Sequence, residues 1–189
     1  MSTPPLLTIG HSNHRFPHFG NLLQAHGVEA VADVRSWPAS RHAPWFDRHS
    51  LTESLRSRDI GYVFLGRELG GRPKGDSYYD SSGHVLYDRV ADSDLFERGL
   101  DRLLTGIETK RVAIMCAEEN PEHCHRRLLV ARVLFERGVP VQHIRAGGQL
   151  EDEHGFAEPN PTLFSDGELP WRSTQSASPR RAPSISSAA

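Results

Sequence analysis

The sequence lacks an apolar run long enough to span a membrane, and its first residues lack the pattern of a secretory signal. We therefore expect a cytoplasmic protein without a membrane partner. Two cysteines are too few for a disulfide framework. The net charge is only −2, which argues against the global basic surface of a tight, non-specific DNA-binding protein. The small net charge does not exclude a local basic cleft. The sequence contains no internal repeat.

Short apolar runs alternate with segments of helical spacing. The 189 residues, 37% of them hydrophobic, suit one domain with a proper core. The predicted strands cover residues 5–9, 29–34, 61–65, 111–115 and 139–144, and the predicted helices cover 17–26, 47–58, 93–108 and 121–137. The sequence therefore predicts an α/β fold, a single three-layer domain with a mostly parallel sheet of about five strands flanked by helices, in an order that it does not reveal.

The apolar pattern is lost in two parts of the chain. Residues 66–92 are rich in Gly, Ser, Asp and Tyr, and we interpret them as a long irregular segment that is functional or mobile. We expect the α/β domain to cover residues 1–146 and a peripheral extension to cover 147–172. Residues 173–189 have little to bury and should form a disordered tail.

The most informative stretch, residues 110–144, is predicted to form a strand, a short loop, a helix and a second strand. Asn120 is a good N-cap, and Pro121 suits the first helical position, where its missing N–H group would have no partner in any case. Gly138 is predicted to end this helix. Such a unit gathers polar residues at one strand end and one helix start, where chemistry in parallel sheets is usually found.

Residues able to do chemistry follow three separate predicted strands, namely His11 and Ser12, Asp33 and Arg35, and Cys116 and Glu118. The ends of neighbouring parallel strands converge, so we expect these side chains on one rim, with Arg41, Arg72 and Lys74 on loops beside it. His11, Asp33 and Glu118 are candidates for acid–base catalysis. The alternative is a buried ion-pair network, for instance Asp33 with Arg35 or Glu118 with Arg126.

Cys116 is the candidate nucleophile. A thiol at a strand end that faces a helix N-terminus has a lowered pKa, and the thiolate is the reactive form. The layout is similar to phosphatase and rhodanese loops, in which a cysteine, a loop and an arginine surround an oxyanion. This loop is longer, however, and contains three glutamates and no glycine. The alternative is a small buried cysteine that fills the strand end.

The second cysteine and the neighbouring histidines give weaker signals. Cys124 lies on one helical stripe with Leu128, which predicts that it faces the sheet, and no Cys-x-x-Cys motif supports a disulfide switch. His123, Cys124 and His125 are consecutive in a predicted helix and should point in different directions, and the short paired spacings typical of zinc ligands are absent. We predict no metal ligand, and any cofactor is unknown.

Basic and aromatic residues are interleaved on the predicted loops. Arginine suits bidentate oxyanion contacts, and aromatic rings can stack on bases. The pattern favours a phosphorylated or nucleotide-like ligand, with a solvated basic rim and plain turns as the alternative. The predicted contacts are Ser12, Arg35, Arg41, Gly70, Gly71, Arg72, Cys124, His125 and Arg126, and the aromatic candidates are Trp37, Trp45, Phe46, Tyr78 and Tyr79.

Four motifs resemble successive signatures of the domain of unknown function 488 family. They are TIGHS at residues 8–12, DVRSWPASRHAPWF at 33–46, ELGGRP at 68–73 and MCAEENPEHCHR at 115–126. The resemblance covers residues 6–144 in the right order. It implies a compact α/β fold, and it implies little about activity because the family has no assigned one.

The leading hypothesis is an enzyme of unassigned reaction that binds a phosphorylated or nucleotide-like ligand at the carboxyl ends of the parallel strands. Arg35, Arg41 and Arg126 would hold the anion, with Cys116 as the nucleophile. A second hypothesis is a non-catalytic module that binds or senses nucleic acid through the same rim. A third is a thiol redox or metal-binding protein. The sequence leaves the substrate, the oligomeric state and the choice between enzyme and binding module open.

Overall fold

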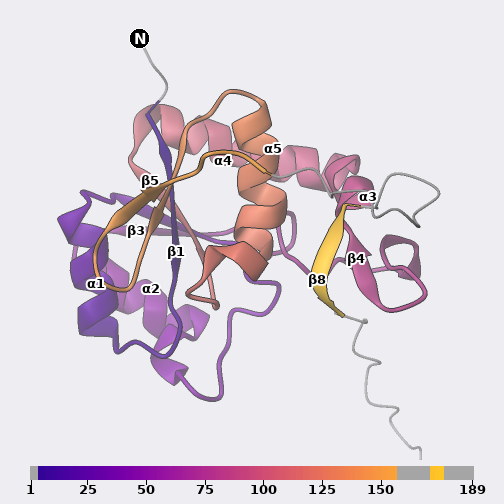
Figure 1. Ribbon diagram of the computed structural model, residues 1–189. Coiled ribbons are helices and arrows are strands. Elements are labelled where there is room, and N and C mark those ends of the chain that lie inside the picture. Colours follow the sequence, from indigo (N-terminus) through magenta and orange to yellow (C-terminus); the bar gives the residue numbers. More distant parts are fainter. Residues whose placement is uncertain (1–3, 157–170, 177–189) are drawn as a thin grey trace, which may run out of the picture.

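The computed structural model describes residues 4–156 and 171–176, which form an α/β fold around a mostly parallel sheet (Figure 1). The six strands have the order β3-β2-β5-β1-β6-β7, in which the first five are parallel and β7 is antiparallel to β6. Their bounds are β1 Leu6–Gly10, β2 Ala30–Asp33, β3 Gly61–Phe64, β5 Val112–Cys116, β6 Val141–Ile144 and β7 Leu150–Asp152. The predicted fold class is confirmed, and the five predicted strands correspond to β1, β2, β3, β5 and β6.

Helices cover both faces of the sheet, as Figure 1 shows. One layer contains α1 (Phe16–Ala25) and α2 (Arg48–Arg56). The other contains α3 (Tyr87–Ala91), α4 (Asp94–Thr109), the π-helical segment η4 (Arg126–Ala131) and α5 (Arg132–Glu136). Among the described residues, no helix is both long and apolar enough to cross a membrane.

Strand β5 determines which layer Cys116 faces. Val112, Ile114 and Cys116 belong to the core under α4 and α5, whereas Ala113 and Met115 belong to the core under α1 and α2. This alternation follows from the two-residue period of a strand. Cys116 is therefore the last inward side chain on the α4–α5 face, at the carboxyl end of the strand.

The helix predicted over residues 121–137 is not continuous. Residues Pro121–His123 form a separate 3₁₀ turn (η3), capped by the Asn120 side chain, which accepts a hydrogen bond from the Glu122 N–H at 3.0 Å. Cys124 is then extended, with φ −100° and ψ 137°, and the helix begins after His125. The predicted single helical stripe through Cys124 was therefore wrong, although Gly138 follows the helix end with φ 83°.

A small second sheet covers one end of the domain. Strand β4 (His84–Leu86) pairs antiparallel with β8 (Arg172–Ser176), and a 3₁₀ turn (η2, Asp76–Tyr78) precedes β4. The segment 66–92, predicted to be irregular, thus contains η2, β4 and α3. Residues 173–176 belong to the tail predicted to be disordered, yet they form part of β8, and residues 177–189 lie outside the described chain.

The loop after β5 lies directly against the end of β1. The His11 N–H donates to the Cys116 carbonyl at 2.9 Å, and the Ser12 N–H donates to the Ala117 carbonyl at 2.8 Å. A Cβ atom at Gly10 would stand 1.8 Å from the Glu118 carbonyl oxygen. Only glycine at this position allows the loop to approach, because backbone cannot move aside as a flexible side chain can.

This close approach predicts the effect of a methyl group at Gly10. Gly10→Ala should lower the free energy of unfolding by about 2 kcal/mol or more, because the loop must be displaced. Gly106→Ala in α4 is the matched control, since its Cβ would meet no atom nearer than 3.7 Å. The control should leave stability unchanged or raise it by up to about 1 kcal/mol. Urea denaturation measures both, and equal stabilities for the two variants would contradict the prediction.

Candidate functional site

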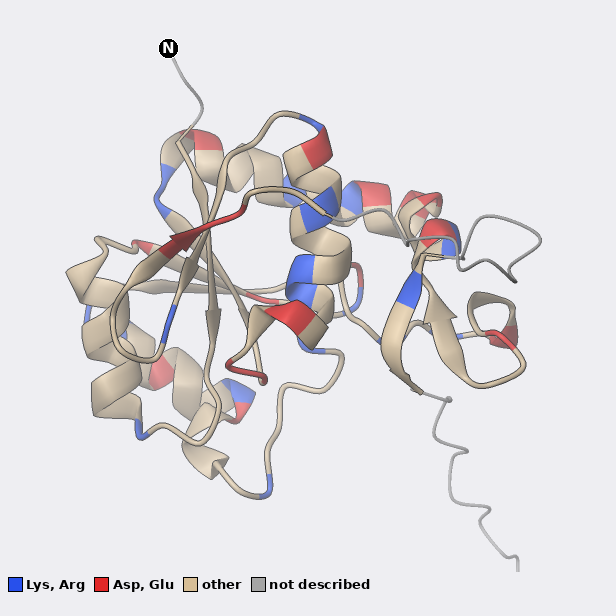
Figure 2. Cartoon of the chain, viewed as in Figure 1, with Lys and Arg blue, Asp and Glu red and all other residues tan. Residues whose placement is uncertain are grey.

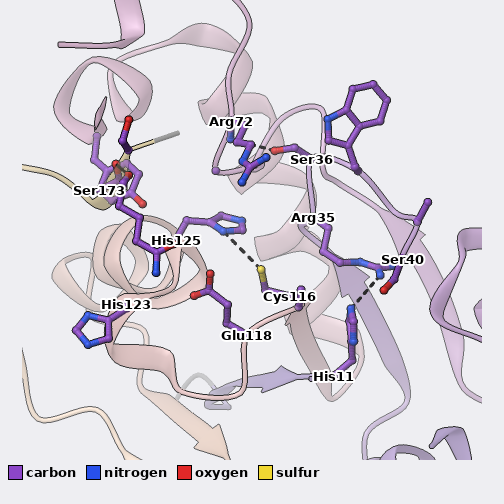
Figure 3. Close-up of a pocket in the computed structure, with 17 residues that line it drawn as sticks. His11, Arg35, Ser36, Ser40, Arg72, Cys116, Glu118, His123, His125 and Ser173 are labelled. Carbon is purple, nitrogen blue, oxygen red and sulfur yellow. Dashed lines mark hydrogen bonds between the residues drawn. The ribbon is translucent and has the colours of Figure 1, made fainter. Parts of the chain in front are cut away.

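A cavity of about 270 Å³ lies at the carboxyl ends of β1, β2 and β5 (Figure 3). Strand β8 contributes to its wall through Ser173, Gln175 and Ser176. The other lining residues come from the strand ends and the loops beside them, namely His11, Arg35, Ser36, Trp37, Ala39, Ser40, Gly71, Arg72, Tyr87, Cys116, Ala117, Glu118, His123 and His125. The three segments expected to converge therefore meet at this cavity.

Several predicted site residues lie elsewhere. Arg41 lines a neighbouring pocket, which shares Trp37, Ala39, Ser40 and Arg72 with the cavity. Ser12, Asp33, Gly70, Cys124 and Arg126 are among the described residues that do not line the cavity. Basic and acidic residues are interspersed over the described chain in Figure 2, as the small net charge suggests.

Asp33 positions Arg35 and does not face the cavity. Its carboxylate is fully buried and accepts hydrogen bonds from Arg35 Nε at 2.9 Å, from Arg35 Nη2 at 2.7 Å and from the Tyr62 hydroxyl at 2.8 Å. Arg35 Nη2 also donates to the Phe46 carbonyl. The backbone N–H of Arg35 donates a fourth hydrogen bond to this carboxylate at 3.0 Å. This is the buried ion pair considered as the alternative, and its four hydrogen bonds leave Asp33 without a free lone pair for acid–base work.

His11 is also held by its neighbours. Its Nδ1 donates to the Ser12 carbonyl at 2.7 Å, its Nε2 accepts from Arg35 Nη1 at 3.1 Å, and its ring stacks on Phe46. Burial, with Arg35 beside the ring, lowers the pKa of His11 to about 4. The imidazole is therefore neutral near pH 7 and orients Arg35, which lines the cavity.

Arg126 is fully buried behind the loop that follows Cys116. Its guanidinium donates to the carbonyls of Glu118 and Glu119, and its Nε donates to the Thr8 hydroxyl. All peptide bonds of the described chain are trans, so the N–H of each peptide unit points opposite to its carbonyl. The N–H groups of Glu119 and Asn120 thus point away from Arg126. Its donors hold the loop from behind, in place of the predicted contact with an anion.

Cys116 and His125 form a paired thiol and imidazole. The Cys116 Sγ lies 3.6 Å from His125 Nδ1 (Figure 3), and His125 Nε2 lies 2.9 Å from the Val34 carbonyl oxygen. A carbonyl can only accept, so Nε2 carries a proton and Nδ1 is left to take the proton of the Cys116 thiol, which gives an imidazolium beside a thiolate. Burial opposes this charge, but the hydrogen bonds of the ring to Cys124 and to the Val34 carbonyl raise the pKa of His125. Gly71 packs on this ring, where a Cβ would stand 2.6 Å from His125 Cγ. The ring is thereby fixed in orientation.

The two cysteines differ in character. A hydrogen bond from the Cys124 thiol, followed by the positive charge of Arg126 and the Ala117 N–H, lowers the pKa of Cys116. Burial raises the pKa of Cys124, which is 1% exposed. Both cysteines are free. Cys116 is therefore the more easily ionised of the two cysteines and borders the cavity, while Cys124 lies behind it.

Glu118 supplies the free carboxylate of the cavity. Its side chain is exposed and lies beside Cys116 in Figure 3, and it makes no hydrogen bond or ion pair to the described residues. Glu119, by contrast, is paired with Arg145 through two hydrogen bonds of 3.0 Å. The negative charge that the sequence places on this loop is thus partly neutralised away from the cavity.

Sequence reasoning missed two features of this site. His125 was predicted only as a ligand contact, because its pairing with Cys116 depends on the extended conformation of Cys124. The wall contributed by β8 was missed because Ser173, Gln175 and Ser176 lie in a stretch without apolar alternation. The sequence offered one signal for the Cys116–His125 pair, because the two residues stand at opposite ends of a single short loop.

The low pKa of His11 predicts a pH dependence of stability. The pKa is about 4 in the folded protein and 6.5 ordinarily, so the unfolded chain binds the extra proton between these values. The stability due to neutral His11 is fully present above pH 6.5 and is lost as the pH falls toward 4. The loss is at most about 3.4 kcal/mol.

His11→Gln should remove this component, so that its free energy of unfolding falls less steeply over this pH range in urea titrations. His14 and His143, whose pKa values burial also lowers, remain in both proteins and cancel in the comparison. Identical slopes for the variant and the parent would contradict the assignment of a neutral, buried His11.

Comparisons with curated proteins and with solved structures found only distant similarity. Curated proteins include no match. Two crystal structures, at 1.40 and 1.60 Å resolution, of a Shewanella putrefaciens CN-32 protein described as "Putative phosphatase (DUF442)" align with the chain. The first has a TM-score of 0.39 and 14% identity over 71% of this chain and 72% of its own. The second has a TM-score of 0.38 and 16% identity over 68% and 64%.

The family assignment comes from a sequence model. The model for the domain of unknown function DUF488 matches residues 15–133, which is more than half of the chain and includes three of the four motifs in full. This confirms the resemblance seen in the motifs, and the chain belongs to the DUF488 family.

Proposed function

We propose that this protein is an enzyme that binds a phosphorylated or nucleotide-like ligand in the cavity and attacks it with the Cys116 thiolate. The observation that carries the proposal is the 3.6 Å approach of Cys116 Sγ to His125 Nδ1, with the opposite ring nitrogen fixed by the Val34 carbonyl. A nucleophile paired with a base that a third group orients is the recurring arrangement of covalent catalysis.

The residues around the sulfur suit this chemistry. The thiolate would form a bond to the electrophilic phosphorus or carbonyl carbon as the bond to the leaving oxygen breaks, and His125 would pass the former thiol proton to that oxygen. Water would then attack the same atom, break its bond to sulfur and regenerate Cys116. Glu118, whose carboxylate has no partner among the described residues, is placed to take a proton from the attacking water.

The rim supports an anionic ligand with an aromatic part. Arg72 is exposed where the cavity meets the neighbouring pocket, and its backbone is held by a 3.0 Å hydrogen bond from its N–H to the Ser36 hydroxyl. Trp37, which is 69% exposed, borders both hollows. A phosphate near Arg72 and a base stacked on Trp37 would use both features.

Selective alkylation tests the nucleophile without knowledge of the substrate. At pH 7, iodoacetamide should modify Cys116 at least about ten times faster than Cys124, because the thiolate is the reactive form. His125→Ala should slow modification of Cys116 by about tenfold or more. His123→Ala is the matched control, since His123 borders the same cavity. Peptide mass spectrometry gives the rates, and equal reactivity of the two cysteines would remove the nucleophile.

Ligand screening tests the substrate class. Nucleotides or phosphate monoesters should raise the melting temperature of the protein, because a ligand of the folded state stabilises it. Trp37→Ala should weaken nucleotide binding by about tenfold or more. For any ligand that is turned over, Cys116→Ser should lower kcat by at least about 100-fold while binding persists. Turnover that persists at the parent rate in this variant would contradict the mechanism.

The exposed Trp37 with Arg41 and Arg72 also favours a second candidate, a module that binds single-stranded nucleic acid. Binding of an oligonucleotide that weakens as salt rises, without any product and without an effect of Cys116→Ser, would support this candidate over the enzyme.

A further inference from the structure

Three side-chain atoms that could bind a metal meet at the wall of the cavity. Cys116 Sγ, Cys124 Sγ and His125 Nδ1 all lie within 4.8 Å of one another. The distance from His125 Nδ1 is 3.6 Å to the sulfur of Cys116 and 4.0 Å to that of Cys124. Sequence reasoning predicted no metal ligand because consecutive helical residues diverge, but the extended backbone of Cys124 turns its sulfur toward the same point as His125.

We propose that Cys116, Cys124 and His125 form a binding site for a thiophilic divalent cation, with Zn²⁺ as the best match, and that the bound ion blocks Cys116 as a nucleophile. The second half of this statement rests on the proposed function, whereas the first half stands without it.

The spacing matches one face of a zinc coordination tetrahedron. Ordinary zinc–ligand bond lengths give edges of about 3.6 Å between sulfur and nitrogen and about 3.8 Å between two sulfurs. The two sulfur–nitrogen distances of 3.6 and 4.0 Å are therefore close to those of a loaded site. The donors therefore need only small shifts to reach the spacing of a loaded site.

The donor set selects the kind of ion. Two sulfurs and one imidazole nitrogen are soft or borderline ligands, which favour zinc over magnesium or calcium. The hydrogen bond from His125 Nε2 to the Val34 carbonyl is the outer contact that metal-binding histidines commonly make, because it leaves the other nitrogen free for the metal. Cys116 and Cys124 are 7% and 1% exposed, so the ion would be shielded from most solvent.

The fourth position would face the cavity. Cys116 and His125 border the cavity, whereas Cys124 lies behind them, so the three protein ligands approach from the buried side. Water or the Glu118 carboxylate could complete the tetrahedron from the open side. The ion would occupy the Cys116 lone pair and the His125 nitrogen that the nucleophile needs, so the metal-bound and reactive states exclude each other.

The test uses the full chain, stripped of metal by a chelator and titrated with Co²⁺ or Zn²⁺. We expect one ion per chain, with a thiolate-to-cobalt charge-transfer band in the near ultraviolet and a melting temperature raised by Zn²⁺. Cys116→Ser, Cys124→Ser and His125→Ala should each weaken binding at least about tenfold. His123→Ala is the control and should bind as the parent does. Absence of stoichiometric binding by the parent, or binding that survives in all three variants, would overturn the site.

Alkylation separates the two proposals. One equivalent of Zn²⁺ should slow iodoacetamide modification of Cys116 at least about tenfold, and a chelator should restore the rate. Fast modification of Cys116 that Zn²⁺ never slows overturns the metal site and leaves the nucleophile standing. A third outcome is that the protein binds Zn²⁺ tightly, but Cys116 of the metal-free protein reacts no faster than Cys124. This outcome supports the metal site and overturns only its link to catalysis.

Discussion

The buried guanidinium of Arg126 is the interaction on which the site depends. A fully buried cation is costly unless hydrogen bonds satisfy it, and Arg126 finds its acceptors in the carbonyls of Glu118 and Glu119 and in the Thr8 hydroxyl. These are the oxygens of the loop that joins β5 to the helical layer. The loop cannot open without leaving the charge unpaired, so one side chain fixes the direction of several peptide units. The position of Cys116, at the start of this loop, is thereby fixed as well.

The support extends below the loop. The Thr8 hydroxyl that faces Arg126 also lies 2.7 Å from His143 Nδ1, and His143 Nε2 lies 3.2 Å from Glu153. Glu153 in turn forms an ion pair with Arg127, the residue next to Arg126. The start of the helical layer is thus tied to β1, β6 and the turn after β7 by one connected set of buried polar groups. Such a set holds its shape because each member would be costly to leave unsatisfied.

The parts of this architecture that could be read from sequence are those governed by local chemistry. Short apolar runs located the five parallel strands, and the convergence of parallel strand ends brought His11, Arg35 and Cys116 to one cavity. The roles within that cavity were less accessible. The ion pair of Asp33 with Arg35 was the alternative that the sequence offered, and it is the one that forms. Arg126 was expected to hold an anion, but it donates to the carbonyls of Glu118 and Glu119 and to Thr8, which is far from it in the sequence. Periodicity cannot reveal a partner that only the tertiary fold brings close.

The break at Cys124 shows how much one backbone conformation can change. A continuous helix would have separated the donors of Cys124 and His125 around its axis, whereas one extended residue directs both toward Cys116. A cysteine nucleophile needs one sulfur and one base, so these two roles do not account for the sulfur of Cys124. As a thiol, Cys124 donates to the Cys116 thiolate and stabilises it. Without its proton, the same atom is a metal ligand. Metal binding must displace that proton, so the proton of Cys124 and a metal ion compete for one position beside Cys116.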